Sequence, residues 1–165
     1  MSNPKIITFK TSLPAFTFMG IENIVKEDSD FGSFWGNFFG KGGYDPMKPY
    51  ETDPNCVNVW YNKPNGEKIY YQGKLATSDA KAPDGYTVTD FPSVEFLVAT
   101  TEWVETYEET MAHIGMLNTY LETAALPEGY VKCRDDETGI FSIERWGANT
   151  GEGYRYEVWA AIRRG

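Results

Sequence analysis

The chain has 165 residues, of which 41% are hydrophobic and 24% charged, and these values fit one globular domain with its own core. Its net charge of −9 comes from fifteen basic and twenty-four acidic residues, and the nearest thing to a basic cluster is Arg163-Arg164. Nucleic acid and anionic membranes are therefore not expected as direct partners. Aromatic residues make up 16% of the chain, which fits either an aromatic core with scattered surface rings or an aromatic-lined pocket.

Few residues could hold a metal. Cys56 and Cys133 lie far apart and form no CxxC pair, and His113 is the only histidine, so a four-coordinate zinc site lacks ligands. We expect no metal and no cofactor. We expect no signal peptide at residues 1–4, which lack a basic segment followed by an apolar run, and the apolar stretch 16–21 is too short to cross a bilayer. These features predict a cytoplasmic location with reduced thiols.

The first predicted element is extended. Apolar and polar residues alternate over 5–21, which is typical of strands, and Pro14 interrupts the pattern. A short helix is expected over 31–39, with Ser33 as its N-cap and a glycine-rich segment that begins at Gly40 ending it.

A β-hairpin follows this helix. The segment 44–56 is rich in Asp, Pro and Tyr and predicts a loop. Strands are expected at 57–61 and 68–75, because the Asn-Gly pair in the 62–66 turn supplies the positive φ angles of a tight hairpin. The polar segment 77–85 then predicts a linker between two halves.

The second half repeats the order of the first. Extended chain is expected over 86–101, again with a proline inside it. Apolar residues three and four positions apart then predict a long helix over 102–125. A second hairpin is expected, with strands at 139–146 and 154–162 joined by a turn at 147–153.

The two halves also share letters at similar offsets. LPAFTFMG at 13–20 parallels FPSVEFLV at 91–98, and Trp60 and Trp146 end the first hairpin strand of each half. We expect an α+β fold of two pseudo-symmetric strand–helix–strand–strand modules, with antiparallel sheets and a cleft between them. The expected organisation is one domain over 1–165, with module one at about 5–76, a linker at 77–85 and module two at about 86–163.

Two segments carry a resemblance to a known family. WYNKPNGEKIYYQGKL at 60–75 and FSIERWGANTGEGYRYEVWAAI at 141–162 are similar to the GyrI-like family, and the resemblance extends over nearly the whole chain. Its members are effector-binding domains that occur alone or fused to DNA-binding domains of AraC and MerR type regulators. The resemblance implies a ligand cleft between two modules that takes apolar or cationic compounds. The chain departs from the family in its shorter first helix, and we expect no accompanying helix-turn-helix.

The resemblance also implies site residues. Glu157 matches the acidic residue in the family's last strand, and Tyr71 matches its aromatic position in the first module. Since side chains alternate across a strand, Glu157 shares a face with Trp159, and Tyr71 shares the equivalent face with Gly73, where a glycine would leave room for a ligand. The opposite face of 154–162 is expected to pack on helices.

Each of these assignments has a structural alternative. Glu157 could instead form an ion pair with Arg145 or Arg155, and Glu144 with Trp146 is a second same-face pair that is either ligand-binding or structural. Trp103 either rims the cleft or packs at the start of the helix, and Tyr107 is either a ligand contact or core. The expected ligand-binding residues are Glu157, Tyr71, Trp159, Trp146, Glu144, Trp60, Trp103 and Tyr107.

These residues lead to three functional hypotheses. The first is a stand-alone protein that binds apolar, aromatic or cationic compounds, as in drug or toxin sequestration. The second is a hydrolase of strained, cyclopropane-type compounds, the activity of one branch of the family, with Glu157 orienting water and Tyr71 donating to the leaving group. The third is a protein-interaction inhibitor of a topoisomerase. No Ser-His-Asp type triad is recognisable, so ordinary ester or peptide hydrolysis is not expected.

Overall fold

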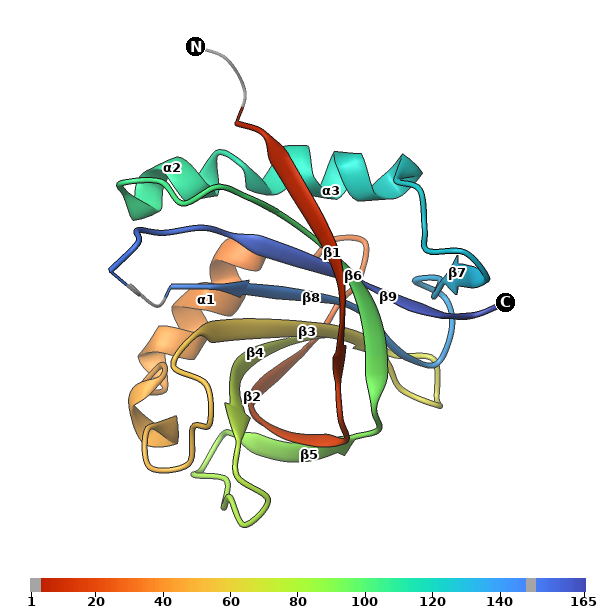
Figure 1. Cartoon of the computed structure of the whole chain (residues 1–165). Coiled ribbons are helices and arrows are strands. Elements are labelled where there is room, and N and C mark those ends of the chain that lie inside the picture. The colour runs from red at the N-terminus through yellow and green to blue at the C-terminus, as the bar shows by residue number, and fades with distance from the viewer. Residues whose placement is uncertain (1–3, 148–150) are drawn as a thin grey trace.

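The computed structural model of the protein describes residues 4–147 and 151–165. In this part of the chain, nine antiparallel strands form one strongly curved sheet (Figure 1). The strands are β1 (Ile6–Leu13), β2 (Phe16–Ile24), β3 (Cys56–Asn62), β4 (Lys68–Ala76), β5 (Thr87–Phe91), β6 (Val94–Thr101), β7 (Tyr130–Lys132), β8 (Gly139–Trp146) and β9 (Glu157–Arg164). The helices are α1 (Phe31–Gly40), the 3₁₀ turn η1 (Asp45–Met47), α2 (Tyr107–Met111) and α3 (Ile114–Thr123).

The predicted α+β class with antiparallel pairing is confirmed, and so are both hairpins. Each predicted extended segment is two strands that are split at its proline: β1 and β2 around Pro14, and β5 and β6 around Pro92. The last strand begins at Glu157, later than expected. The turn predicted at 147–153 lies partly outside the described residues.

The helix predicted over 102–125 is wrong in its extent. Helix α2 begins only after Thr106, whose hydroxyl oxygen accepts a hydrogen bond from the backbone N–H of Glu109. Thr106 followed three residues later by Glu109 is a capping box, a sequence pattern that marks the start of a helix. The apolar periodicity did not show this start. Helix α2 ends at Met111, and α3 begins at Ile114 with Gly115, a poor helix former, in its first turn.

Two smaller expectations also need correction. The N-cap of α1 is Asp30, not Ser33, because Asp30 Oδ1 accepts from the backbone N–H of Gly32 at 3.0 Å. The Ser33 hydroxyl donates instead to Asp30 Oδ2 at 2.9 Å. Strand β7 was not predicted, since three residues are too few to show a period of two.

The pairing order is the same on both sides of the 77–85 segment. The strand before α1, β2, pairs with β4, which pairs with β3; likewise β6 pairs with β9, which pairs with β8. Pairing of β3 with β8 joins the two sets. The first strand of each half pairs with the other half, β1 with β6 and β5 with β2.

The two faces of the sheet hold separate cores. The inner core includes Tyr71 and Trp159, neither of which is more than 9% exposed. On the opposite face, α3 packs over β6 and β9 through Leu117 and Leu121, and α1 packs over β2 through Phe38. The strand face that includes Tyr156 therefore packs on helices as predicted. No helix in the described part is long and apolar enough to cross a membrane.

Candidate functional site

Two cavities lie on the helix-bearing face of the sheet, and they share Glu144 as a wall. We call them the α1 cavity, of about 360 Å³, and the β7 cavity, of about 680 Å³. The α1 cavity is lined by Trp35, Phe39, Tyr44, Asn58, Tyr70, Tyr107, Met111, Ile114, Glu144, Trp146 and Tyr156. The β7 cavity is lined by Trp60, Lys68, Asn118, Leu121, Glu122, Lys132–Asp136, Phe141, Ser142, Glu144, Val158 and Ala160.

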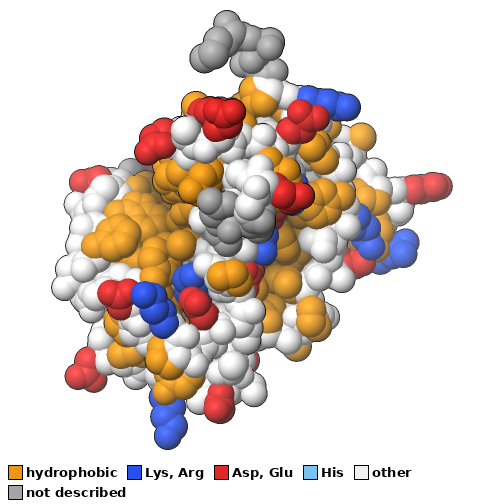
Figure 2. Space-filling view, turned by 60° about the vertical axis from the view of Figure 1, so that its left-hand side comes forward, with side chains coloured by type: hydrophobic (Ala, Val, Ile, Leu, Met, Phe, Trp, Pro, Cys, Tyr) orange, Lys and Arg blue, Asp and Glu red, His pale blue; other side chains and the backbone are white. Residues whose placement is uncertain are grey.

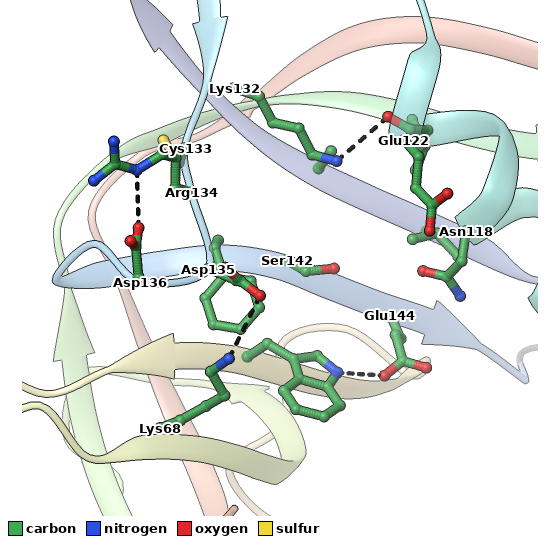
Figure 3. A pocket seen from close by; sticks show the side chains of 15 residues that line it. Lys68, Asn118, Glu122, Lys132, Cys133, Arg134, Asp135, Asp136, Ser142 and Glu144 are labelled. Carbon is green, nitrogen blue, oxygen red and sulfur yellow. Dashed lines mark hydrogen bonds and ion pairs between the residues drawn. The ribbon is translucent and has the colours of Figure 1, made fainter.

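The carboxylate of Glu144 lies between these cavities, on β8. Trp60 Nε1 donates a hydrogen bond to Glu144 Oε1 at 2.6 Å, and the Tyr156 hydroxyl donates to Oε2 (Figure 3 shows the bond from the indole). Since both donors are neutral, they orient the carboxylate without cancelling its charge. Within the described part of the chain, Glu144 forms no ion pair.

Aromatic rings surround Glu144. Trp146 stacks on Tyr156 with a centroid separation of 5.5 Å and an interplanar angle of 12°. Trp35 of α1 meets the Trp146 ring edge-on at 5.9 Å, and Trp60 lies 4.8 Å from Tyr70. A carboxylate among aromatic faces favours a ligand that is both aromatic and cationic, because ring faces also attract cations.

The phenols of the site are protonated at ordinary pH. Burial raises the pKa of Tyr156, and the neighbouring Glu144 carboxylate raises it further. Burial likewise raises the pKa of Tyr70, with a smaller contribution from Glu144. Each phenol can therefore donate a hydrogen bond, whereas Glu144 can only accept.

Charged residues line the far side of the β7 cavity, and four of them form ion pairs. Lys68 pairs with Asp135 at 3.5 Å, and Arg134 pairs with Asp136 at 2.8 Å. Lys132 Nζ donates to the backbone carbonyl of Leu121 at 3.3 Å. Figure 3 shows these groups away from Glu144, which points toward the indole ring.

The opening of the α1 cavity carries exposed apolar side chains. Phe39 of α1 is 60% exposed and Met111 of α2 is 48% exposed, and both line this cavity. Figure 2, in which the left-hand side of Figure 1 comes forward, shows hydrophobic side chains gathered over this side of the molecule. An apolar opening suits the aromatic interior behind it.

Three predicted site residues lie on the opposite face of the sheet. Tyr71 and Trp159 belong to the inner core, and neither they nor Glu157 line the two cavities. The Tyr71 hydroxyl bonds to Thr87, with its Oγ1 2.7 Å away. Neither of these two cavities therefore brings Tyr71 and Glu157 together, which the hydrolase hypothesis requires.

The structure shows the ion-pair alternative for Glu157, which is 4% exposed. Arg145 approaches its Oε1 at 3.1 Å, and Arg155 approaches its Oε2 at 3.0 Å. Trp159 Nε1 also donates to Oε1 at 3.0 Å. Two guanidinium groups cancel the charge that a cationic ligand would need.

The expectation that Gly73 leaves room for a ligand is wrong. Gly73 lies directly opposite Gly20 of β2, and a Cβ atom on Gly73 would lie 1.9 Å from the carbonyl oxygen of Met19. The glycine therefore makes room for the backbone of the neighbouring strand.

Of the remaining predicted residues, Glu144, Trp60, Trp146 and Tyr107 line the cavities. Trp103 does not line either of them, and its ring lies 4.4 Å from the Arg155 guanidinium. Sequence reasoning missed five residues that line the α1 cavity, namely Trp35, Tyr44, Asn58, Tyr70 and Tyr156. The signal for Asn58 was available, since it lies two positions before Trp60 and so shares its face. Among the described residues, no three metal-ligating side chains lie grouped.

Several solved structures are similar to this chain. SAV2435, solved with tetraphenylphosphonium bound, is 12% identical, and the match covers 95% of this chain and 94% of that one with a TM-score of 0.70. A transcription regulation protein of Staphylococcus aureus MU50 is 13% identical over 95% of this chain and 98% of that one, with a TM-score of 0.66. The integron cassette protein VCH_CASS2 of Vibrio cholerae is 11% identical over 94% and 95%, with a TM-score of 0.55. These structures show a shared fold.

A search of curated proteins finds no match. The sequence model of the Cass2 family, described as integron-associated effector binding protein, matches residues 11–162. That match covers nearly all of the strands and helices described above. The chain therefore belongs to the Cass2 family of integron-associated effector-binding proteins, a GyrI-like family of small-molecule-binding domains.

Proposed function

We propose that the protein binds a small aromatic cation between the α1 and β7 cavities, with Glu144 as the counter-charge. The observation that carries this proposal is the environment of Glu144, whose two oxygens accept bonds from the neutral donors Trp60 and Tyr156. A cation that enters the cleft meets a carboxylate that is already oriented and still charged. Little reorganisation is then needed on binding, which favours affinity.

The contrast with Glu157 supports this assignment. Both carboxylates lie on neighbouring strands of one sheet, but two arginines already neutralise Glu157. Transfer of a further cation to Glu157 would require an arginine to lose its partner in a buried place. Binding of tetraphenylphosphonium by SAV2435 is a property of that protein, and it supports the same ligand class here.

The test is titration with tetraphenylphosphonium, measured by calorimetry at constant ionic strength. Glu144→Gln keeps the size of the side chain and removes its charge, so we expect the affinity to fall about 10- to 100-fold, the loss of one charged contact. The affinity for a neutral aromatic probe of similar size should fall much less in Glu144→Gln.

Two matched variants control for non-specific effects. Glu122→Gln removes another charge at the wall of the β7 cavity and should change the affinity less than Glu144→Gln. Glu157→Gln tests the residue that the family resemblance singled out. If Glu157→Gln weakens tetraphenylphosphonium binding and Glu144→Gln does not, the proposed site is wrong.

A further inference from the structure

The α1 cavity contains two polar groups that the cation-binding role of Glu144 does not use. Asn58 is 1% exposed, and its Nδ2 donates to the Tyr70 hydroxyl at 2.7 Å. Its Oδ1 has no hydrogen-bond partner among the described residues, and neither has the buried hydroxyl of Tyr44. Asn58 and Tyr44 both line the α1 cavity.

Such a pair of groups is unusual in one cavity. Buried polar atoms in native proteins nearly always have partners, and those that lack one cost free energy until a partner arrives. The near neighbour of Tyr44 is the Cys56 thiol, which is only a weak hydrogen-bonding group. A ligand that supplies a hydroxyl or amide to these atoms would recover that free energy.

Asn58 and Tyr44 are both neutral. Burial raises the pKa of Tyr44, so its phenol stays protonated, and an asparagine amide carries no charge. Glu144 lines the same cavity and prefers positive charge. The cavity therefore offers two chemically different contacts to one ligand.

The sheet register places these contacts relative to one another. Asn58 lies directly opposite Glu144 across β3 and β8, and Cys56, beside Tyr44, lies opposite Trp146. Two residues along a strand span about 7 Å. A cationic centre near Glu144 and a polar group near Tyr44 would thus be separated by roughly the length of one aromatic ring.

We propose that Asn58 and Tyr44 form a second subsite, which recognises a neutral hydrogen-bonding group carried on the aromatic body of the ligand. The preferred ligand is then an aromatic cation with a hydroxyl or amide one ring away from its charge, and not a purely hydrocarbon cation. This inference rests on the proposed function, because it assumes that Glu144 holds the cationic centre. A hydroxyl suits either group, since it can donate to Asn58 Oδ1 or exchange a hydrogen bond with the Tyr44 phenol.

The test compares two probes that differ by one oxygen atom, tetraphenylphosphonium and (4-hydroxyphenyl)triphenylphosphonium. In the unmodified protein we expect the hydroxylated probe to bind about tenfold more tightly. In Tyr44→Phe and in Asn58→Leu we expect this ratio to fall to about one, because the hydroxyl then loses a partner that repays its desolvation.

The outcomes separate the two proposals. If neither probe binds, the proposed function fails and the subsite fails with it. If both probes bind with equal affinity, or the ratio persists in both variants, only the subsite proposal is overturned. A ratio that falls in the variants supports it.

A measurement without ligand tests the same feature through stability. Tyr44→Phe removes a hydroxyl whose near neighbour is only the weakly bonding Cys56 thiol, so the melting temperature should stay equal or rise. Tyr86→Phe is the matched control in the same hydrophobic cluster, because the Tyr86 hydroxyl donates to the carbonyl of Gly43 at 2.5 Å. That variant should melt at a lower temperature. An equal fall in melting temperature in the two variants would mean that the Tyr44 hydroxyl has a hydrogen-bond partner within the protein, which contradicts the proposal.

Discussion

At the scale of single residues, the partners of a carboxylate decide what it can do. Glu144 and Glu157 lie on adjacent strands, and each accepts a bond from an indole N–H. The second partner of Glu144 is a phenol, whereas Glu157 also meets the guanidinium groups of Arg145 and Arg155. Two arginines therefore neutralise Glu157, whereas Glu144 forms no ion pair within the described part of the chain.

Asp53 extends the buried ion-pair network and should make stability depend on pH. Burial alone would raise its pKa, but hydrogen bonds from Arg145 and Asn55 hold the pKa below its ordinary value. The folded pKa is thus lower than the unfolded one, so the contribution of Asp53 is complete above about pH 4 and is lost as the pH falls through the folded pKa. The melting temperature, measured between pH 2 and pH 7, should fall more steeply with decreasing pH in the unmodified protein than in Asp53→Asn. Parallel curves would contradict this.

At this scale, the sequence predicted which side chains share a strand face more reliably than it predicted what surrounds each side chain. Alternation correctly placed Glu157 with Trp159 on one face and Tyr156 on the other. It could not tell which face would hold a cavity, because that depends on where the helices lie over the sheet. Nor could it show that both arginines reach Glu157, since Arg145 arrives from a different strand.

At the scale of elements, the meeting of β2 and β4 depends on a pair of glycines. Gly20 and Gly73 face each other, and a Cβ on Gly20 would lie 2.0 Å from the carbonyl oxygen of Gln72. Backbone atoms cannot move aside as the end of a flexible side chain can. This close approach brings β2 against β4, and β4 carries Tyr70 to the α1 cavity.

We therefore expect Gly73→Ala to destabilise the protein by about 3 kcal/mol, the upper range for overpacking. Gly36→Ala is the control, because a Cβ at Gly36 in α1 meets no atom within 4 Å. Alanine at a helix-interior position should stabilise by about 0.5–1 kcal/mol. Urea unfolding of both variants measures the difference, and similar free energies of unfolding would contradict the steric argument.

Most strands could be predicted because alternation and turn residues are local signals. Both hairpins formed, although the last strand begins later than predicted, and a proline lies at the break within each extended segment. The long second helix could not be bounded, because its apolar period continues across the break between α2 and α3. A capping residue decided the start where periodicity did not.

At the scale of the whole molecule, the exchange of first strands links the two halves. Strand β1 pairs over its whole length with β6, from Ile6 opposite Thr101 to Leu13 opposite Val94. Strand β5 pairs with β2 in the same way, and β3 pairs with β8. A repeat in the letters predicted similar halves, but it carries no information on which half a strand pairs with. Such long-range pairing depends on closure of the whole sheet.

This exchange predicts that neither half folds alone. A fragment of residues 1–80 would lose the partners of β1 and β3, and a fragment of 81–165 would lose those of β5 and β8, so each would expose unpaired edges and part of the inner core. We expect both fragments to be unfolded by circular dichroism and to regain strand signal and cooperative melting when they are mixed in equal amounts. The control is the full chain, cut within 77–85 after folding, which should keep its signal because that segment contains no strand or helix. Cooperative unfolding of either fragment by itself would show that the strand pairs between the halves are dispensable. The circular dichroism signal of the mixture would then equal the sum of the two fragment signals.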